Sequence, residues 1–162
     1  NVIYTVVMKL SDRWINIFMG VAFSIAKASK DGSLKVGSVL VRPDKTIASI
    51  GFNGFPKRIE DDENILNDDS MKHIKYSRIV HAECNCLNYN RDIDLNRFHL
   101  FVTAHPCDKC ALRIASTDIS YIYYAINDDF ENRWKSEIKI AKDIFLDAGI
   151  EIYGWDINPT HL

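Results

Sequence analysis

Apolar residues recur along this chain in two rhythms, and each rhythm predicts one kind of element. In residues 12–30 and again in residues 131–148 they return every three or four positions, which is typical of a helix with one buried face. Gly149 is expected to end the second of these helices. The buried stripe of the first is expected to contain Trp14, Ile17, Phe18, Val21, Ala22 and Ile25.

Shorter apolar runs predict strands. The expected strands are residues 36–41, 47–52, 99–103, 119–126 and 150–155. Pro43 and Asp44 mark a turn between the first two, so these two should form a β-hairpin. Helices are expected to begin near His81, running to about Asn90, and near Cys107. This order predicts an α/β fold of three layers, in which a five-stranded mixed sheet carries helices on both faces.

The segment of residues 55–80 is rich in charge and is expected to be a solvated loop with a short helix. It leads directly from Asn53 to His81, so its basic side chains are candidates for binding a phosphate. Asn53 itself lies among glycines, which let a ligand approach the backbone. The simpler interpretation of Asn53 is that its side chain favours a turn.

Composition narrows the class of protein. A length of 162 residues favours a single domain, residues 1–162, with a core of about residues 12–156. The net charge of −2 argues against a dedicated nucleic-acid binder, and no apolar run approaches the length that spans a membrane. Residues 1–8 are apolar and are expected to be an edge strand or a tail that packs on a partner chain. Four cysteines at two places favour metal binding in a reducing compartment.

Two short motifs provide the candidate chemistry. Catalytic zinc takes three nitrogen or sulfur ligands and keeps a fourth position open for water. His81, Cys107 and Cys110 supply such a set. Pro106 suits the first turn of a helix, and the two cysteines would then share one face near its positive end, where thiol pKa values fall.

Glu83 follows His81 by two residues, a spacing that points side chains to nearly opposite sides in the middle of a helix. The two side chains converge only if both lie at the very start of a helix with the metal beyond its end. In that arrangement Glu83 contacts the metal-bound water without being a ligand, and it can carry the water's proton.

Other interpretations of these residues stay open. Cys84 is three residues from His81 and would close the zinc site as a fourth ligand, leaving no catalytic position. A disulfide between Cys107 and Cys110 is a second alternative, although it leaves the His-x-Glu pair unexplained. Cys84 and Cys86 are otherwise expected to be small buried residues of the helix.

The chain resembles zinc-dependent deoxycytidylate deaminases of the cytidine deaminase superfamily over roughly residues 14–154. The His-x-Glu and Pro-Cys-x-x-Cys pair is the known signature of zinc nucleobase deaminases. The resemblance also rests on the segments at residues 28–31, 35–39, 51–56 and 103–110. It implies a cytidine-deaminase-like fold, one Zn²⁺ per chain and hydrolytic deamination of dCMP to dUMP, a step that supplies dUMP for dTMP synthesis. A cytoplasmic location, or the host cytoplasm for a viral chain, is also expected.

The resemblance assigns further roles by position. Glu83 would pass a proton to N3 of cytosine and then to the departing ammonia, while the Ala82 amide holds the pyrimidine O2. Asn53 would contact the sugar or base. Ser29 and Lys30 would lie near the nucleotide phosphate.

Family members are commonly hexamers regulated by dCTP and dTTP, which implies an effector site at Gly51, Phe52 and Gly54 and possible binding of Mg²⁺ with the triphosphate. His105 and residues 127–129 depart from the family's usual pattern at the place where its substrate pocket lies. For this reason dCTP or a modified cytosine nucleotide is the alternative substrate. The other functional alternatives are a nucleic-acid cytosine or adenosine deaminase and a zinc-stapled interaction module without enzymatic activity.

Overall fold

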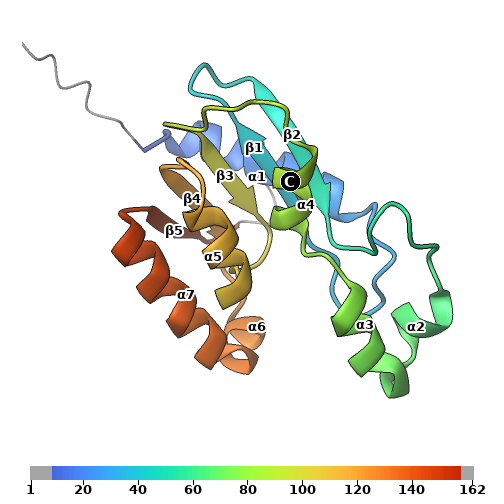
Figure 1. Ribbon diagram of the computed structural model, residues 1–162. Helices are drawn as coiled ribbons and strands as arrows, with labels where there is room; N and C mark the ends of the chain where they lie inside the picture. The colour runs from blue at the N-terminus through green and yellow to red at the C-terminus, as the bar shows by residue number, and fades with distance from the viewer. Residues whose placement is uncertain (1–8, 158–162) are drawn as a thin grey trace, which may run out of the picture.

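A single mixed sheet forms the centre of the molecule in the computed structural model, which describes residues 9–157 (Figure 1). Its strands are β1 (Gly37–Val41), β2 (Ile47–Phe52), β3 (His99–Val102), β4 (Tyr121–Ala125) and β5 (Glu151–Trp155). They lie in the order β2-β1-β3-β4-β5. β1 pairs antiparallel with both β2 and β3, whereas β3, β4 and β5 run parallel. The predicted hairpin and mixed sheet are therefore confirmed, while the expectation for residues 1–8 lies outside the described residues.

Helices cover both faces of the sheet, as expected. They are α1 (Asp12–Ala26), α2 (Glu63–Asn67), α3 (Lys72–Arg78), α4 (Ala82–Tyr89), α5 (Asp108–Ala115), α6 (Asp128–Arg133) and α7 (Lys135–Ala148), with a 3₁₀ turn η1 (Asp69–Met71). α1 packs on one face, and α4, α5 and α7 pack on the other (Figure 1). No helix within residues 9–157 is long and apolar enough to cross a membrane.

Two glycines let helices approach the hairpin very closely. A Cβ atom on Gly37 would lie 1.9 Å from the carbonyl oxygen of Ala22 in α1. A Cβ atom on Gly51 would lie 2.4 Å from the carbonyl oxygen of Ala82 and 2.3 Å from the amide nitrogen of Cys86 in α4. Backbone therefore packs on backbone at both places, and β2 fixes the position of the first turn of α4.

The buried face of α1 is rotated relative to the expected stripe. Its buried residues are Ile15, Phe18, Met19, Ala22 and Ala26. Ile17 is 42% exposed, and Trp14 lies at the edge, where it stacks on Phe18 with 5.5 Å between ring centroids. The prediction failed here because α1 is apolar around most of its circumference, so several stripes fit the same helical spacing.

The helix predicted for residues 131–148 is two helices, and the first begins earlier than expected. The side-chain oxygen of Asn127 accepts a hydrogen bond from the Phe130 amide at 3.0 Å, which caps α6. The helix is then interrupted at Trp134, and α7 begins at the next residue. Asn127 therefore starts a helix as well as ending a strand. Gly149 ends α7 with a left-handed φ of 70°, as predicted.

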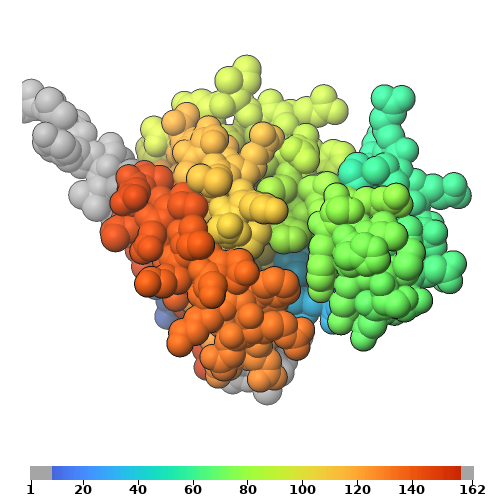
Figure 2. Space-filling view, turned by 60° about the horizontal axis from the view of Figure 1, so that its bottom comes forward, coloured from blue at the N-terminus to red at the C-terminus, as the bar shows by residue number. Residues whose placement is uncertain are grey.

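Residues 55–80, called the insert below, fold into α2, η1 and α3 and contain more helix than expected. Their apolar side chains form a small separate cluster consisting of Phe55, Ile65, Leu66, Met71, Ile74 and Ile79. Figure 1 shows α2 and α3 standing away from the sheet. Figure 2 shows a hollow between the insert and the block formed by α6 and α7, with atoms of the chain near residue 30 at its floor.

Candidate active site

The first motif lies at the start of α4. His81 is the residue immediately before the helix, and its carbonyl accepts a hydrogen bond from the Asn85 amide at 2.9 Å. Ala82 and Glu83 occupy the first turn, so the helix begins where the spacing predicted. Glu83 is only 3% exposed, which turns its carboxyl group into the protein and away from bulk solvent.

The second motif lies at the start of α5. Cys107 precedes the helix with an extended backbone, and its carbonyl accepts from the Ala111 amide at 2.8 Å. The helix itself begins at Asp108, so the prediction that Pro106 lies in its first turn was wrong. A carboxylate in the first helical turn is favoured by the helix dipole, and this favours Asp108 as the first helical residue. Cys107 and Cys110 still project from the same helix start.

Three side chains from the two helix starts converge. Nδ1 of His81 lies 3.2 Å from Sγ of Cys110 and 3.5 Å from Sγ of Cys107. Within the described residues, these three form the group of His, Cys and acidic side chains whose ligand atoms all lie within 4.8 Å of one another. Ligands of a tetrahedral zinc ion lie roughly 3.3–3.8 Å apart, so both the donor types and their spacing fit Zn²⁺.

The close contacts within this cluster shift the pKa values of its three side chains. Hydrogen bonds with Cys110 and His81 lower the pKa of the Cys107 thiol to about 4. The same thiolate raises the pKa of His81 to about 9. The pKa of Cys110 is raised, because it shares its proton with Cys107 and Cys84 and is buried. The donors thus compete for protons in one small volume, and a divalent cation there would satisfy all three.

Glu83 lies beside this cluster. Its pKa is raised, chiefly by burial, and this effect is opposed by the charge of His81 and by a hydrogen bond with Cys110. A buried carboxyl group next to a set of metal ligands is placed to accept and return a proton of a water molecule held there.

The four cysteines are free thiols, so the structure does not contain the alternative Cys107–Cys110 disulfide. Cys84 is only half-buried, so the expectation that it is a buried residue was wrong. Its Sγ atom lies 3.6 Å from Sγ of Cys110, but it is not a member of the converging group. Cys86 is fully buried under β2, where it contacts the Ser49 hydroxyl at 3.3 Å, as expected for a small core residue.

Comparison with known proteins decides the family. Residues 12–126 match the sequence profile described as the cytidine and deoxycytidylate deaminase zinc-binding region. The chain belongs to this deaminase family. It is 35% identical over 141 residues to an uncharacterized deaminase from Aliivibrio fischeri, covering 86% of this chain and 92% of that protein. It is 31% identical over 145 residues to the mouse deoxycytidylate deaminase, covering 85% of this chain and 76% of the mouse protein.

The fold is also that of a solved member of the family. The dCMP deaminase of cyanophage S-TIM5, in complex with dCMP and dUMP, superposes with a TM-score of 0.69 at 20% identity. The match covers 91% of this chain and 100% of the phage chain. The predicted cytidine-deaminase-like fold is therefore confirmed.

The family resemblance assigned Ser29, Lys30 and Asn53 to substrate binding, and hydrogen bonds within the loop after α1 hold two of them in place. Ser29 is buried, and its hydroxyl donates to the carbonyl of Asn53 at 2.8 Å. Oδ1 of Asn53 accepts from the Val36 amide at 2.8 Å, and its Nδ2 donates to the Leu34 carbonyl at 2.9 Å. Lys30 extends into solvent and pairs with a carboxylate of the insert. The structure thus joins Ser29 to Asn53 and leaves Lys30 at the surface.

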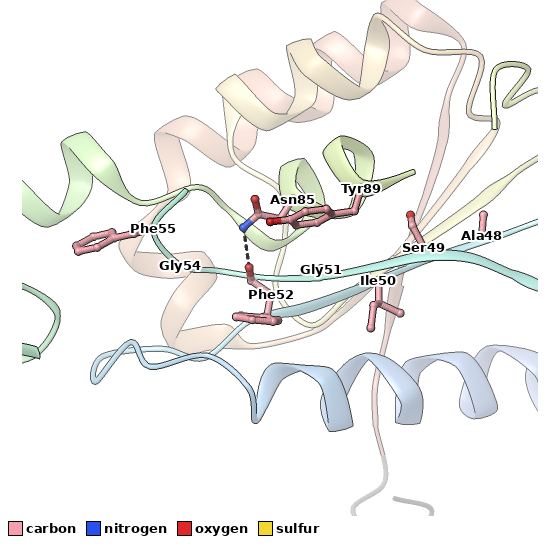
Figure 3. Close-up of a pocket in the computed structure, with 9 residues that line it drawn as sticks. All are labelled: Ala48, Ser49, Ile50, Gly51, Phe52, Gly54, Phe55, Asn85 and Tyr89. Carbon is pink, nitrogen blue, oxygen red and sulfur yellow. Dashed lines mark hydrogen bonds between the residues drawn. The ribbon is translucent and has the colours of Figure 1, made fainter. Parts of the chain in front are cut away.

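The residues expected at an effector site line a groove beside β2. Gly51, Phe52 and Gly54 border a cavity of about 370 Å³, together with Asn85 and Tyr89 of α4 (Figure 3). The side chain of Asn85 closes one wall by donating to the Phe52 carbonyl at 2.8 Å. Ala82, by contrast, is buried in the first turn of α4, next to the converging side chains of His81, Cys107 and Cys110.

The structure gives His105 and Lys75 contacts that the sequence did not predict. Nδ1 of His105 hydrogen-bonds to the Pro106 carbonyl at 2.8 Å, and its ring packs against Tyr124. The Nε2 atom of His105 is buried and has no hydrogen-bond partner. Lys75 is fully buried in α3, where it meets Asp31. No sequence signal separates Lys75 from the other basic residues of the insert, because its neighbours along the chain do not differ in kind from theirs.

Proposed function

We propose that this chain catalyses the hydrolytic deamination of dCMP to dUMP with one bound Zn²⁺. The observation that carries the proposal is the meeting of His81, Cys107 and Cys110 beside the buried Glu83. Membership of the deaminase family supports it, as do relatives named deoxycytidylate deaminase that are similar over most of the chain. The fold shared with a phage dCMP deaminase gives further support.

Each residue of the cluster has a separate task in this proposal. His81, Cys107 and Cys110 hold the zinc ion, which when bound makes water acidic enough to act as a nucleophile near neutral pH. Glu83 would take one proton of that water and place it on N3 of cytosine, where it stays in the uracil product, while the water oxygen forms its bond to C4. Glu83 would then carry the second proton, from the new C4 hydroxyl, to the amino nitrogen, which leaves as ammonia when the C4–N4 bond breaks. The Ala82 amide, in the same helical turn, holds the pyrimidine O2. Burial keeps Glu83 away from bulk water, which would compete for the proton.

We assign the sugar and phosphate of the nucleotide to the hollow between the insert and the block formed by α6 and α7. We propose that Asn53 contacts the sugar or the base with a side chain that Val36 and Leu34 already hold in one orientation. The Ser29 hydroxyl holds the backbone of Asn53 in place by donating a hydrogen bond to its carbonyl. Lys30, which is exposed at the rim, attracts the phosphate.

Regulation and assembly are proposed on similar grounds. The groove at Gly51, Phe52 and Gly54 is the proposed effector site for dCTP or dTTP, with Mg²⁺ accompanying the triphosphate. A homo-oligomer, a hexamer by family resemblance, is proposed because Ile47, Ile50 and Phe52 expose apolar surface along the edge strand β2. A cytoplasmic location is supported by the free thiols.

The decisive experiment measures ammonia release by the zinc-loaded protein from dCMP, dCTP, deoxycytidine and a cytosine-containing oligonucleotide. We expect the highest kcat/KM for dCMP. A preference for dCTP would instead favour the triphosphate alternative. Preference for the oligonucleotide would favour a nucleic-acid deaminase. Ammonia release from none of these compounds, nor from adenine compounds, would favour the non-enzymatic interaction module.

A further inference from the structure

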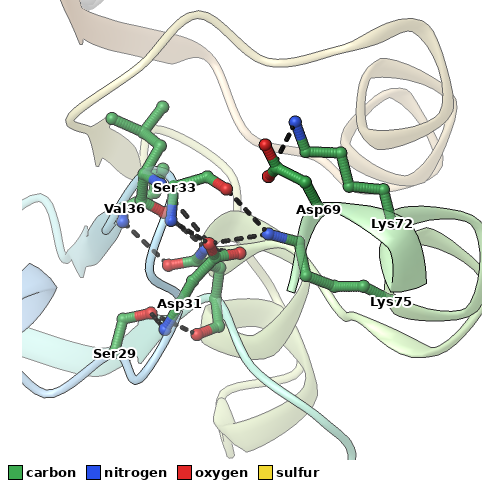
Figure 4. Close-up of polar contacts among 9 residues, drawn as sticks. Ser29, Asp31, Ser33, Val36, Asp69, Lys72 and Lys75 are labelled. Atoms are coloured by element: carbon green, nitrogen blue, oxygen red, sulfur yellow. Dashed lines mark hydrogen bonds and ion pairs between the residues drawn. The ribbon is translucent and has the colours of Figure 1, made fainter. Parts of the chain in front are cut away.

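A buried ion pair joins the insert to the loop after α1 (Figure 4). Nζ of Lys75 lies 2.9 Å from Oδ1 of Asp31, and the two side chains are only 2% and 6% exposed. Nζ also donates to the Ser33 hydroxyl at 3.1 Å. A buried lysine is costly unless its partner is fixed in place, so this pair holds the two segments in one relative position.

Asp31 is the centre of the network that orders the loop. Its Oδ1 atom accepts from the Ser33 amide at 2.8 Å and from the Leu34 amide at 3.4 Å. Its Oδ2 atom accepts from Nδ2 of Asn53 at 3.4 Å. Lys75 therefore reaches Asn53 through a single intervening carboxylate.

The other attachments of the insert to the rest of the molecule are of different kinds. Tyr76 of α3 packs edge-on against Trp134, between α6 and α7, with 6.4 Å between ring centroids. The helices of the insert pack on one another around their own apolar cluster, and among the described elements their main helix contacts are with each other. An exposed pair, Lys30 with Asp61 at 2.9 Å, adds a solvent-screened contact. At the end of the insert, Val80 and Gly54 exchange backbone hydrogen bonds of 2.8 and 3.1 Å immediately before His81. The Lys75–Asp31 pair is therefore the buried polar attachment between α3 and the floor of the hollow.

We propose that Lys75 is a positioning residue for substrate binding. Through Asp31 it fixes the orientation of Asn53 and sets the distance between the insert and the loop after α1, the segments that border the hollow. This inference rests on the proposed deaminase function. Zinc binding and proton transfer take place at α4 and α5 and do not use this pair, so loss of the pair should raise KM and leave kcat nearly unchanged.

The test compares Lys75→Met with the double variant Asp31→Asn/Lys75→Met and with Lys72→Met. Lys75→Met alone leaves a buried carboxylate unpaired, and its protein is expected to be poorly folded. The double variant removes both charges and should regain thermal stability. Lys72 is the matched control, because it lies on the same helix and pairs with Asp69 at 3.0 Å at the surface.

For the double variant we expect one zinc per chain, kcat close to wild type and a KM for dCMP raised about tenfold, since small misplacements of binding groups have effects of this order or larger. Lys72→Met should match wild type in all three. A well-folded double variant with wild-type KM would overturn the proposal. If Lys75 has only a structural role, both Lys75 variants should have a lower melting temperature, and KM should not rise selectively over kcat. That result would also overturn the proposal.

Hydrogen exchange provides a second readout that needs no activity. Amides of Ser33, Leu34 and Val36 are bonded to Asp31 or Asn53. They should exchange faster in the double variant than in wild type or Lys72→Met. Unchanged exchange in the double variant would overturn the positioning role, whatever the activity of the wild-type protein. Absence of ammonia release by wild type from every cytosine compound would instead refute the proposed function and leave the exchange result unaffected.

Discussion

The Sγ atoms of Cys84 and Cys110 lie 3.6 Å apart, although the two residues come from the first turns of different helices. Cys110 also meets His81, whereas Cys84 lies outside the group of ligand atoms that converge. The geometry thus favours a three-ligand zinc site with a neighbouring thiol over a closed four-ligand site.

Replacing Cys84 tests this assignment. Cys84→Ala should keep one zinc per chain and retain kcat within about twofold, because a catalytic zinc site needs three protein ligands. Cys107→Ala, the comparison variant, should lose zinc and activity together. Metal analysis of the purified proteins measures both. Loss of zinc from Cys84→Ala would identify a closed site and remove the basis for catalysis.

Replacing Glu83 tests the proton shuttle. Glu83→Gln has nearly the same shape and should bind zinc and fold normally, while deamination falls by roughly 10²–10⁴-fold, the usual contribution of a general acid–base group. Glu60→Gln, the same exchange at an exposed position, should have no effect. Steady-state ammonia release, metal content and melting temperature are measured together. Full activity in Glu83→Gln would show that another group moves the proton.

Glycine is required at Gly51 and not at Gly54. An added Cβ at Gly51 would meet the backbone of Ala82 at 2.4 Å, so α4 would have to move. At Gly54 the nearest side-chain atom, in Phe52, is 3.9 Å away. We expect Gly51→Ala to lower the free energy of unfolding by about 1–3 kcal/mol or more, as overpacking does, and Gly54→Ala to have a much smaller effect. Denaturant unfolding of both variants checks this. Equal effects would mean that β2 and α4 adjust freely to one another.

His99 should make the fold sensitive to acid. Burial lowers its pKa to about 4, and the positive charge of Lys45 adds to this effect. In the unfolded chain the pKa is about 6.5, so the unfolded state binds more protons between these values. The contribution of His99 to the free energy of unfolding is therefore fully present above pH 6.5. It decreases as the pH falls toward 4, by up to about 3 kcal/mol.

Replacing His99 with phenylalanine should remove that part of the pH dependence. The ring would still stack on Tyr121, as His99 does with 5.0 Å between centroids, although the contact with the Tyr123 hydroxyl is lost. The relevant measurement is the difference in unfolding free energy between wild type and His99→Phe at pH 7 and pH 5. A difference that does not change with pH would mean that His99 does not titrate on unfolding in this range.

The sequence was most informative where local spacing and chemistry agree. The helix start at His81 was predicted because His81 and Glu83 converge only at the end of a helix. Gly149 was predicted as a helix end because it adopts a left-handed φ readily. The α1 stripe was misjudged because nearly every side of that helix is apolar. Such a choice is made by the shape of the sheet that the helix packs on, which the sequence does not state.

Contacts between distant segments were beyond sequence reasoning. Asp31 and Lys75 are 44 positions apart, and both belong to polar segments that are typical of solvent-exposed loops. Asn53 was singled out for its chemistry, but the partners that hold its side chain were not foreseen. The position of Cys84 beside Cys110 likewise depends on how the starts of α4 and α5 meet on one face of the sheet.

The insert encloses an apolar cluster of its own, built from residues such as Phe55, Leu66 and Ile74. Because this cluster is separate from the two larger cores on either side of the sheet, substitutions within it should alter the insert without repacking those cores. The chain should therefore tolerate changes of sequence in this segment while His81, Cys107 and Cys110 keep their geometry at the two helix starts.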